Sequence, residues 1–159
     1  MYSHLEDFIY ELYTSIGVGK PEDLDMFKIA KELGIKIVYE KRAFMFDDEI
    51  LLTRGTEREE WMLFGHETTH YLRHCGHQIR MHTLFRQLQE YQAEHFAYHF
   101  CVPTFMLEEL KEVTVREIMN QFNVDYDFAL RRFEMFKNKL FFQSGYYLPS
   151  RKKIAVGTK

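Results

Sequence analysis

Two histidines and a glutamate in the middle of the 159-residue chain have the spacing of a metal-dependent hydrolase. Residues 64–72 read FGHETTHYL and contain His-Glu-x-x-His. Residues four apart on a helix lie on the same face, so His66 and His70 can direct both imidazoles at one metal ion. Glu67 can then take a proton from the attacking water. This is the arrangement of a zinc peptidase.

The flanks of this motif favour metal binding over chance. Two histidines on a helix are also found as ordinary surface residues, and the five-residue motif alone does not separate the two cases. Here apolar residues stand on both sides, so we expect the helix to be at least half buried. Buried ionisable groups are costly unless they are paired or coordinated. The apolar flanking residues are Trp61, Met62, Leu63, Phe64, Tyr71 and Leu72.

A catalytic zinc usually has three protein ligands and one open position, so a third ligand is needed. His74 stands too far from His66 on a straight helix, roughly 12 Å along the axis. His77 misses by one residue the place of the third histidine in the extended zinc-peptidase pattern. Arg73 stands where that pattern needs a glycine. Neither histidine is therefore favoured.

The helix expected after residue 82 offers two acids four residues apart, Glu90 and Glu94. One of them can bind the metal while the other hydrogen-bonds a ligand histidine and fixes its tautomer. Ala93 and Ala97 stand on the same face, and small residues allow close helix packing. This favours an inward-facing acid over a pair of solvated glutamates.

Turn residues and changes of hydrophobic period divide the chain into elements. Ser/Thr-x-x-Glu capping boxes at Ser3, Thr56 and Thr114 mark three helix starts. Apolar residues at helical spacing predict the helices, and alternation over 35–39 predicts a half-buried strand. The expected helices are 4–16, 22–33, 57 to about 75, 83–101, a short one capped by Thr104 through Leu110, 115–122 and 126–139. The expected strands are 35–39, 44–46 and 50–53, with a turn at 47–48, and we expect them to form a small antiparallel sheet.

Composition and charge exclude several classes of protein. The formal net charge is −3, which argues against nucleic-acid binding by the whole molecule. Cys75 and Cys101 do not make a disulfide framework, and the sequence contains no apolar run of membrane length. The first residues have neither the basic nor the apolar region of a secretory leader, so we expect none. We expect a cytoplasmic protein with reduced thiols and no membrane segment. The helices 115–122 and 126–139 form a hairpin whose many aromatic residues favour packing, so direct DNA binding is not expected.

Three segments together resemble the ImmA/IrrE metallopeptidases: residues 66–70 (HETTH), residues 90–97 (EYQAEHFA) and Pro103. Members of that family carry His-Glu-x-x-His, then a segment like Glu-x-Gln-Ala-Asn-x-Phe-Ala, then a proline. The resemblance covers most of the chain and is closest to the shorter ImmA-type members of mobile elements and prophages. It implies an α+β fold, mostly helical and zincin-like, with the small sheet and the C-terminal hairpin. We also expect a metallopeptidase domain (1–110) and a helical C-terminal extension (111–159) packed on it, the two forming one structural unit.

The resemblance also implies roles for the site residues. His66, His70 and Glu90 are the expected zinc ligands, and Glu67 is the expected catalytic acid and base. Glu94 stands where the family often has Asn or Asp and is expected beside a ligand. The group that stabilises the oxyanion is left open among Tyr71, His74, His77, His82, His95 and His99, with Tyr71 and His99 as candidate substrate-binding residues.

The expected function is that of a zinc endopeptidase that cleaves a cytosolic helix-turn-helix repressor at one site and so derepresses mobile-element, prophage or stress genes. One alternative is a non-catalytic regulator that binds a repressor or DNA and uses the metal only for folding. Such a metal site is closed by four protein ligands, and Glu67 would be dispensable. A second alternative is a general peptidase, against which the resemblance argues.

Overall fold

The computed structural model describes residues 1–41, 44–46, 49–73 and 83–144. The candidate ligands His74 and His77, together with His82 and Cys75, lie outside them. The elements in chain order are α1 (His4–Ser15), the 3-10 helix η1 (Pro21–Asp23), α2 (Met26–Glu32), β1 (Lys36–Tyr39), β2 (Phe44–Phe46), β3 (Glu49–Leu52), α3 (Glu57–Arg73), α4 (Thr83–Cys101), α5 (Thr104–Glu109), α6 (Val115–Phe122) and α7 (Tyr126–Ser144).

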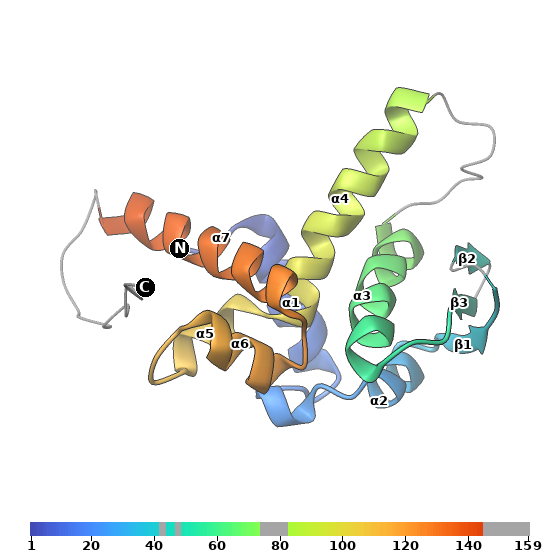
Figure 1. Cartoon of the computed structure of the whole chain (residues 1–159), viewed down its shortest axis with the longest axis horizontal. Coiled ribbons are helices and arrows are strands. Elements are labelled where there is room, and N and C mark those ends of the chain that lie inside the picture. The colour runs from blue at the N-terminus through green and yellow to red at the C-terminus, as the bar shows by residue number, and fades with distance from the viewer. Residues whose placement is uncertain (42–43, 47–48, 74–82, 145–159) are drawn as a thin grey trace.

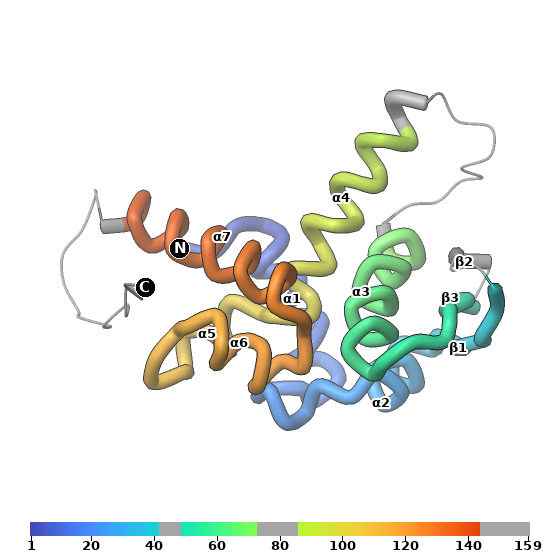
Figure 2. Tube along the Cα trace, in the orientation of Figure 1, coloured from blue at the N-terminus to red at the C-terminus, as the bar shows by residue number. Residues whose placement is uncertain are grey.

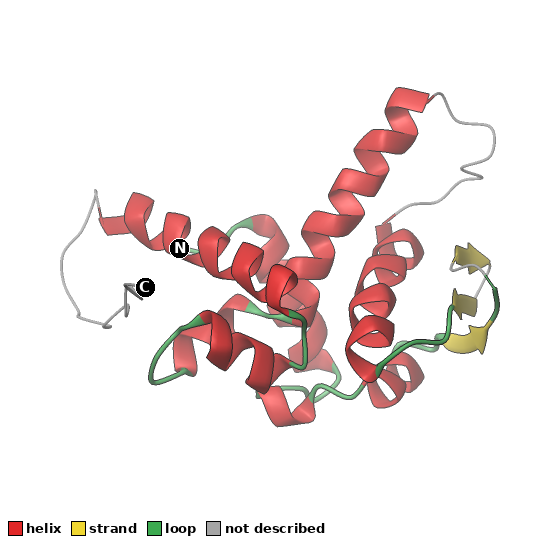
Figure 3. Cartoon of the chain, in the orientation of Figure 1, coloured by secondary structure: helices red, strands yellow, loops and turns green. Residues whose placement is uncertain are grey.

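Helix α3 lies between the small sheet and α4 (Figure 1). The strands are confined to one side of the molecule, and α1, α5, α6 and α7 gather around the C-terminal half of α4 (Figure 3). The trace shows α3 and α4 running in opposite directions (Figure 2). The α+β class and the C-terminal hairpin predicted from the sequence are confirmed. Within the described segments, no helix has both the length and the apolar character to cross a membrane.

Local sequence explains where the helices begin. The Ser3 hydroxyl accepts the amide of Glu6 at 3.3 Å, and the Glu6 carboxylate accepts the amide of Ser3 at 2.7 Å. The same reciprocal pair forms between Thr56 and Glu59 at the start of α3, and Thr114 caps α6. These bonds satisfy amides that the first turn of a helix leaves free. The predicted capping residues are therefore confirmed at all three positions.

The sheet is mixed, which corrects the antiparallel sheet expected from the sequence. Its strand order is β1-β3-β2. β2 and β3 pair antiparallel, as predicted, but β1 pairs with β3 in parallel, with Ile37 opposite Ile50. Because β2 and β3 are close in sequence and form a hairpin, they leave the other edge of β3 for β1. Ile50 and Leu52 of β3 are completely buried, and β3 packs against α3.

The start of α5 and the end of α7 also differ from the prediction. Pro103, not Thr104, is the N-cap of α5, and Thr104 is the first helical residue. The Thr104 hydroxyl donates to Glu6 Oε1 at 2.6 Å and accepts from Arg132 Nη2 at 2.7 Å. Two buried charged groups therefore use the side chain that was expected to cap the helix. Helix α7 continues to Ser144, beyond the expected end at Lys139.

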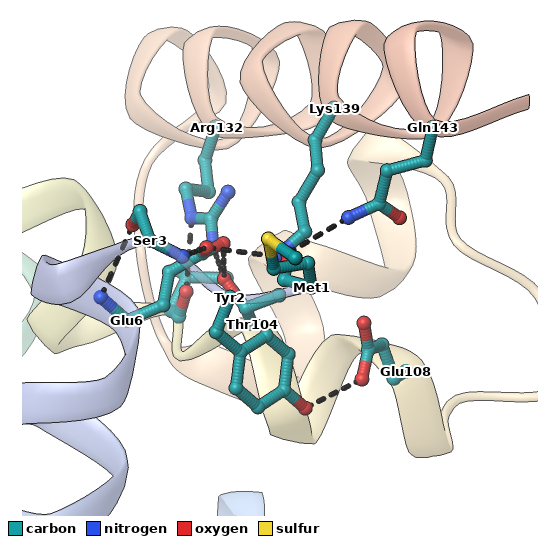
Figure 4. A network of polar contacts seen from close by, with 10 residues as sticks. Met1, Tyr2, Ser3, Glu6, Thr104, Glu108, Arg132, Lys139 and Gln143 are labelled. Atoms are coloured by element: carbon teal, nitrogen blue, oxygen red, sulfur yellow. Dashed lines mark hydrogen bonds and ion pairs between the residues drawn. The ribbon is translucent and has the colours of Figure 1, made fainter. Parts of the chain in front are cut away.

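Glu6 is the centre of a buried polar network that joins α1, α5 and α7 (Figure 4). Lys139 Nζ of α7 donates to Glu6 Oε2 at 2.8 Å. Arg132, also from α7 and only 1% exposed, donates from Nε to the carbonyl of Val102 at 2.9 Å, directly after α4. Buried charges are tolerated when they are paired and hydrogen-bonded, as here. The network joins α7 to α1, to α5 and to the residue after α4. That residues 1–110 and 111–159 form a domain and a packed extension of one structural unit stays a prediction.

The network predicts a specific acid sensitivity. Burial by itself would raise the pKa of Glu6, but its hydrogen bonds, of which the one from Lys139 is the largest, lower it from 4.5 to about 2. The folded pKa lies below the unfolded one, so the stabilisation is complete above about pH 4.5 and is lost as the pH falls toward 2. We expect Glu6→Gln to lower the free energy of unfolding at pH 7 by about 1–3 kcal/mol and to flatten its pH dependence between 4.5 and 2.

Urea unfolding of metal-free protein over that pH range measures this effect. Glu11→Gln, on the exposed side of the same helix, is the matched control and should keep the parental profile. Parallel profiles for Glu6→Gln and the parent would contradict the assignment of acid sensitivity to Glu6.

Candidate metal centre

Helix α3 provides the platform of the centre. It is covered by the sheet on one side and by α4 on the other, so Phe64, Thr68 and Thr69 are completely buried. His66 and His70 stand one turn apart on this helix, and their Nε2 atoms lie 3.4 Å from each other. The side chain of His70 is 7% exposed and that of His66 is 26% exposed. The pair therefore lies at the edge of the core, with one side open.

Helix α4 brings the third group. Glu90 Oε2 lies 3.2 Å from His66 Nε2, and Glu90 Oε1 lies 3.7 Å from His70 Nε2. Because α4 runs antiparallel to α3, Glu90 near the middle of α4 comes level with the end of α3. The hydroxyl of Thr69 lies 3.3 Å from the carbonyl oxygens of Gly65 and Ala93 and shares its single proton between them, which links the two helices beside the histidines.

The spacing of these three groups fits a tetrahedral metal ion. Potential ligand atoms of His66, His70 and Glu90 all lie within 4.8 Å of one another. Zinc bonds of about 2.0–2.1 Å in tetrahedral geometry place neighbouring ligand atoms about 3.3–3.4 Å apart. The distances of 3.4 Å between the two Nε2 atoms and 3.2 Å from Glu90 Oε2 to His66 Nε2 agree with this requirement. Two imidazoles and one carboxylate are also a donor set of catalytic zinc sites, with one position left for substrate or water.

Glu67 is a buried acid beside this cluster. It is 6% exposed. Burial raises its pKa, and the negative charge of Glu90 raises it further, to about 7. A carboxyl group with a pKa near neutrality can both accept and release a proton, which is the property that acid–base catalysis requires. A cation bound nearby would favour its ionised form.

Glu94 lies elsewhere than expected. It is exposed, and its Oε1 accepts a hydrogen bond from the hydroxyl of Tyr98 at 3.2 Å. It lines a surface pocket together with Tyr91, His95, Tyr98, Arg131 and Met135, between α4 and α7. Successive residues are turned by about 100° around a helix. With Ala93 completely buried, Glu94 points away toward solvent. Its contact in the structure is with Tyr98 rather than with a histidine of the cluster.

His99 and Tyr71 are likewise outside the cluster. His99 is 7% exposed and lies roughly 13 Å along α4 from Glu90. Burial and the charge of Arg132 lower the pKa of His99 to about 2, so its ring is neutral. Its Nδ1 has no hydrogen-bond partner among the described residues.

Tyr71 is half-buried and packs against the hydrophobic core. Within the described segments, His66, His70 and Glu90 are the group that the structure brings together for a metal.

Thr69 is a contributor that the sequence-based prediction did not single out. It occupies one of the two variable positions of the His-Glu-x-x-His motif, where any residue satisfies the pattern. Its hydroxyl nevertheless connects α3 to the backbone of α4. Its role could have been suspected from the sequence, because Thr69 stands on a helix that the small residue Ala93 allows to pack closely.

Comparison with known proteins agrees with this geometry. The family described as Peptidase_M78, the IrrE N-terminal-like domain, matches residues 30–134. The phage-like element PBSX protein XkdA of Bacillus subtilis (strain 168) is 41% identical over 148 residues, covering 86% of this chain and 75% of that protein. The uncharacterized protein YqaB of the same organism is 30% identical over 150 residues, covering 87% of each. No solved structure matches the chain significantly. The chain thus belongs to the ImmA/IrrE family of metallopeptidases that its paired motifs predicted.

Proposed function

We propose that this protein is a zinc-dependent endopeptidase that cleaves a cytosolic helix-turn-helix repressor at a specific site. The observation that carries the proposal is the meeting of His66, His70 and Glu90 beside the buried acid Glu67. Family membership supports a protein substrate. The choice of a repressor rests on the resemblance to ImmA-type members, and a relative named for a phage-like element supports a role in prophage or mobile-element control.

Each residue of the cluster has a distinct task in peptide hydrolysis. His66, His70 and Glu90 would hold the ion, which when bound would polarise the scissile carbonyl and acidify the attacking water. Glu67 would take a proton from the water and then deliver it to the leaving amine. Its position directly after His66 on α3 places this carboxyl group beside the ligands, and a bound cation would favour its ionised, basic form. Glu90 is exposed, so a polypeptide can approach the site from solvent.

The alternative of a purely structural metal site has less support. A structural zinc is closed by four protein ligands, whereas the cluster found in the described part of the chain has three. Direct DNA binding by the hairpin is also disfavoured. Arg132 and Lys139, two of the basic residues of α7, are used in the buried network with Thr104 and Glu6.

Removal of the third ligand should abolish tight zinc binding. We expect Glu90→Ala to weaken zinc affinity by at least roughly 100-fold, because two imidazoles alone hold zinc poorly. Glu94→Ala is the matched control on the same helix and should bind zinc like the parent. Competition with a chromogenic chelator measures both affinities. Parental affinity in Glu90→Ala, or an equal loss in Glu94→Ala, would move the third ligand away from Glu90.

Removal of the acid should stop cleavage without loss of the metal. We expect Glu67→Gln to keep zinc and to lower the rate of repressor cleavage by roughly 10²–10⁴-fold, the usual contribution of a general base. The assay uses zinc-loaded protein and a purified helix-turn-helix repressor, with cleavage followed by mass spectrometry. Glu57→Gln, an exposed acid in the first turn of α3, is the control.

The same assay separates the alternatives. Cleavage by Glu67→Gln at the parental rate would refute the assigned mechanism. Relief of repression by zinc-loaded parent without any cleavage would instead support a regulator that acts by binding.

A further inference from the structure

Gly65 occupies an unfavourable place for a glycine, inside a 17-residue helix and directly before His66. Glycine is disfavoured in helix interiors compared with alanine. The glycines with positive φ in the described chain are Gly17 and Gly34, so the backbone at residue 65 does not require a glycine. The reason for the glycine therefore lies in the space around it.

That space is filled by α4. A Cβ atom at position 65 would lie 2.6 Å from the Sγ of Cys101 and 3.3 Å from Cδ1 of Phe100, with the Cα of Ala97 at 3.8 Å. Cys101 and Phe100 are completely buried and Ala97 is 3% exposed. The Sγ of Cys101 is also held within 3.6 Å of the carbonyl of Trp61. Close-packed neighbours of this kind cannot move aside into solvent, so an added methyl would push α3 and α4 apart.

The separation of these two helices sets the geometry of the metal cluster. His66 and His70 are on α3 and Glu90 is on α4, and the contact from Glu90 Oε2 to His66 Nε2 is 3.2 Å. Thr69, between the two histidines, donates to the carbonyl of Ala93 across the contact between α3 and α4. Because Gly65 and His66 are neighbours in the same helix, a shift of α3 away from α4 at Gly65 also moves His66 away from Glu90.

We propose that Gly65 is a positioning residue for the metal site: its missing side chain lets α3 approach α4 closely enough for Glu90 to meet both histidines. This inference rests on the proposed zinc site. It differs from a general packing role, because packing alone predicts a change of stability and no change in the zinc affinity of the folded protein.

The experiment measures zinc affinity by chelator competition and stability by urea unfolding without metal, under conditions where circular dichroism shows each protein folded. We expect Gly65→Ala to raise the Kd for zinc by about tenfold or more. Cys101→Ala removes the sulfur atom that the new methyl would meet. The double variant Gly65→Ala/Cys101→Ala should therefore return to within about threefold of the parental Kd. Ile118→Ala, in the buried core of α6, is the control that loses stability and keeps zinc affinity.

Thr69→Val provides an independent variant that preserves volume if Gly65→Ala alone does not fold. It removes the hydroxyl that links the helices, and we expect it to raise the Kd for zinc by about threefold. Parental affinity in both Gly65→Ala and Thr69→Val would overturn the inference, as would equal weakening in Ile118→Ala. A parent that binds zinc but cleaves no repressor would refute only the proposed function. A parent that binds no zinc would refute the metal site and this inference with it.

Discussion

The close packing of α3 against α4 is the interaction on which the rest of the structure depends. Neither helix carries a complete metal site, and an aromatic cluster around Phe100 holds the two together. The ring of Phe100 lies 5.7 Å from that of Trp61 and 6.0 Å from that of Phe64, both on α3. It also lies 5.2 Å from the ring of Tyr13, whose hydroxyl donates to the Phe100 carbonyl at 2.7 Å. Burial of these rings supplies the free energy that holds polar groups together at the edge of the core.

Two buried glutamates, Glu6 and Glu67, have pKa values that are shifted in opposite directions. Glu6 is 7% exposed and Glu67 is 6% exposed. Hydrogen bonds, chiefly from Lys139, outweigh burial at Glu6 and lower its pKa to about 2. Glu67 has the negative charge of Glu90 nearby, and burial raises its pKa to about 7. A carboxyl group whose burial is compensated serves stability, whereas one left uncompensated beside a candidate metal site is poised for proton transfer.

The features that the sequence predicted correctly are determined by residues within one or two helical turns. The features it predicted wrongly depend on contacts with elements far away in the chain. The spacing of His66 and His70 and the capping residues Ser3, Thr56 and Thr114 act within one or two turns, so pattern alone located them. Alternation identified β1 as a strand, but its parallel pairing depends on which edge of β3 the hairpin leaves free. Threonine often caps helices, yet the hydroxyl of Thr104 is hydrogen-bonded to Arg132 and Glu6, which lie 28 and 98 positions away in the chain. Glu90 and Glu94 were equivalent by spacing. The family resemblance favoured Glu90, and in the structure it is Glu90 that faces the histidines of α3, whereas Glu94 contacts Tyr98.

Helix α7 of the C-terminal hairpin contacts the helix that carries Glu90. Arg132 of α7 donates to the carbonyl of Val102, the residue that follows α4, and α4 is the helix that carries Glu90. Lys139 connects α7 to Glu6 and hence to α1, which itself packs on α4. These contacts fix the C-terminal end of α4, so that packing at Gly65 sets its distance from α3. The family match over residues 30–134 runs through α6 into α7, so the part of α7 that carries Arg132 lies within the matched domain.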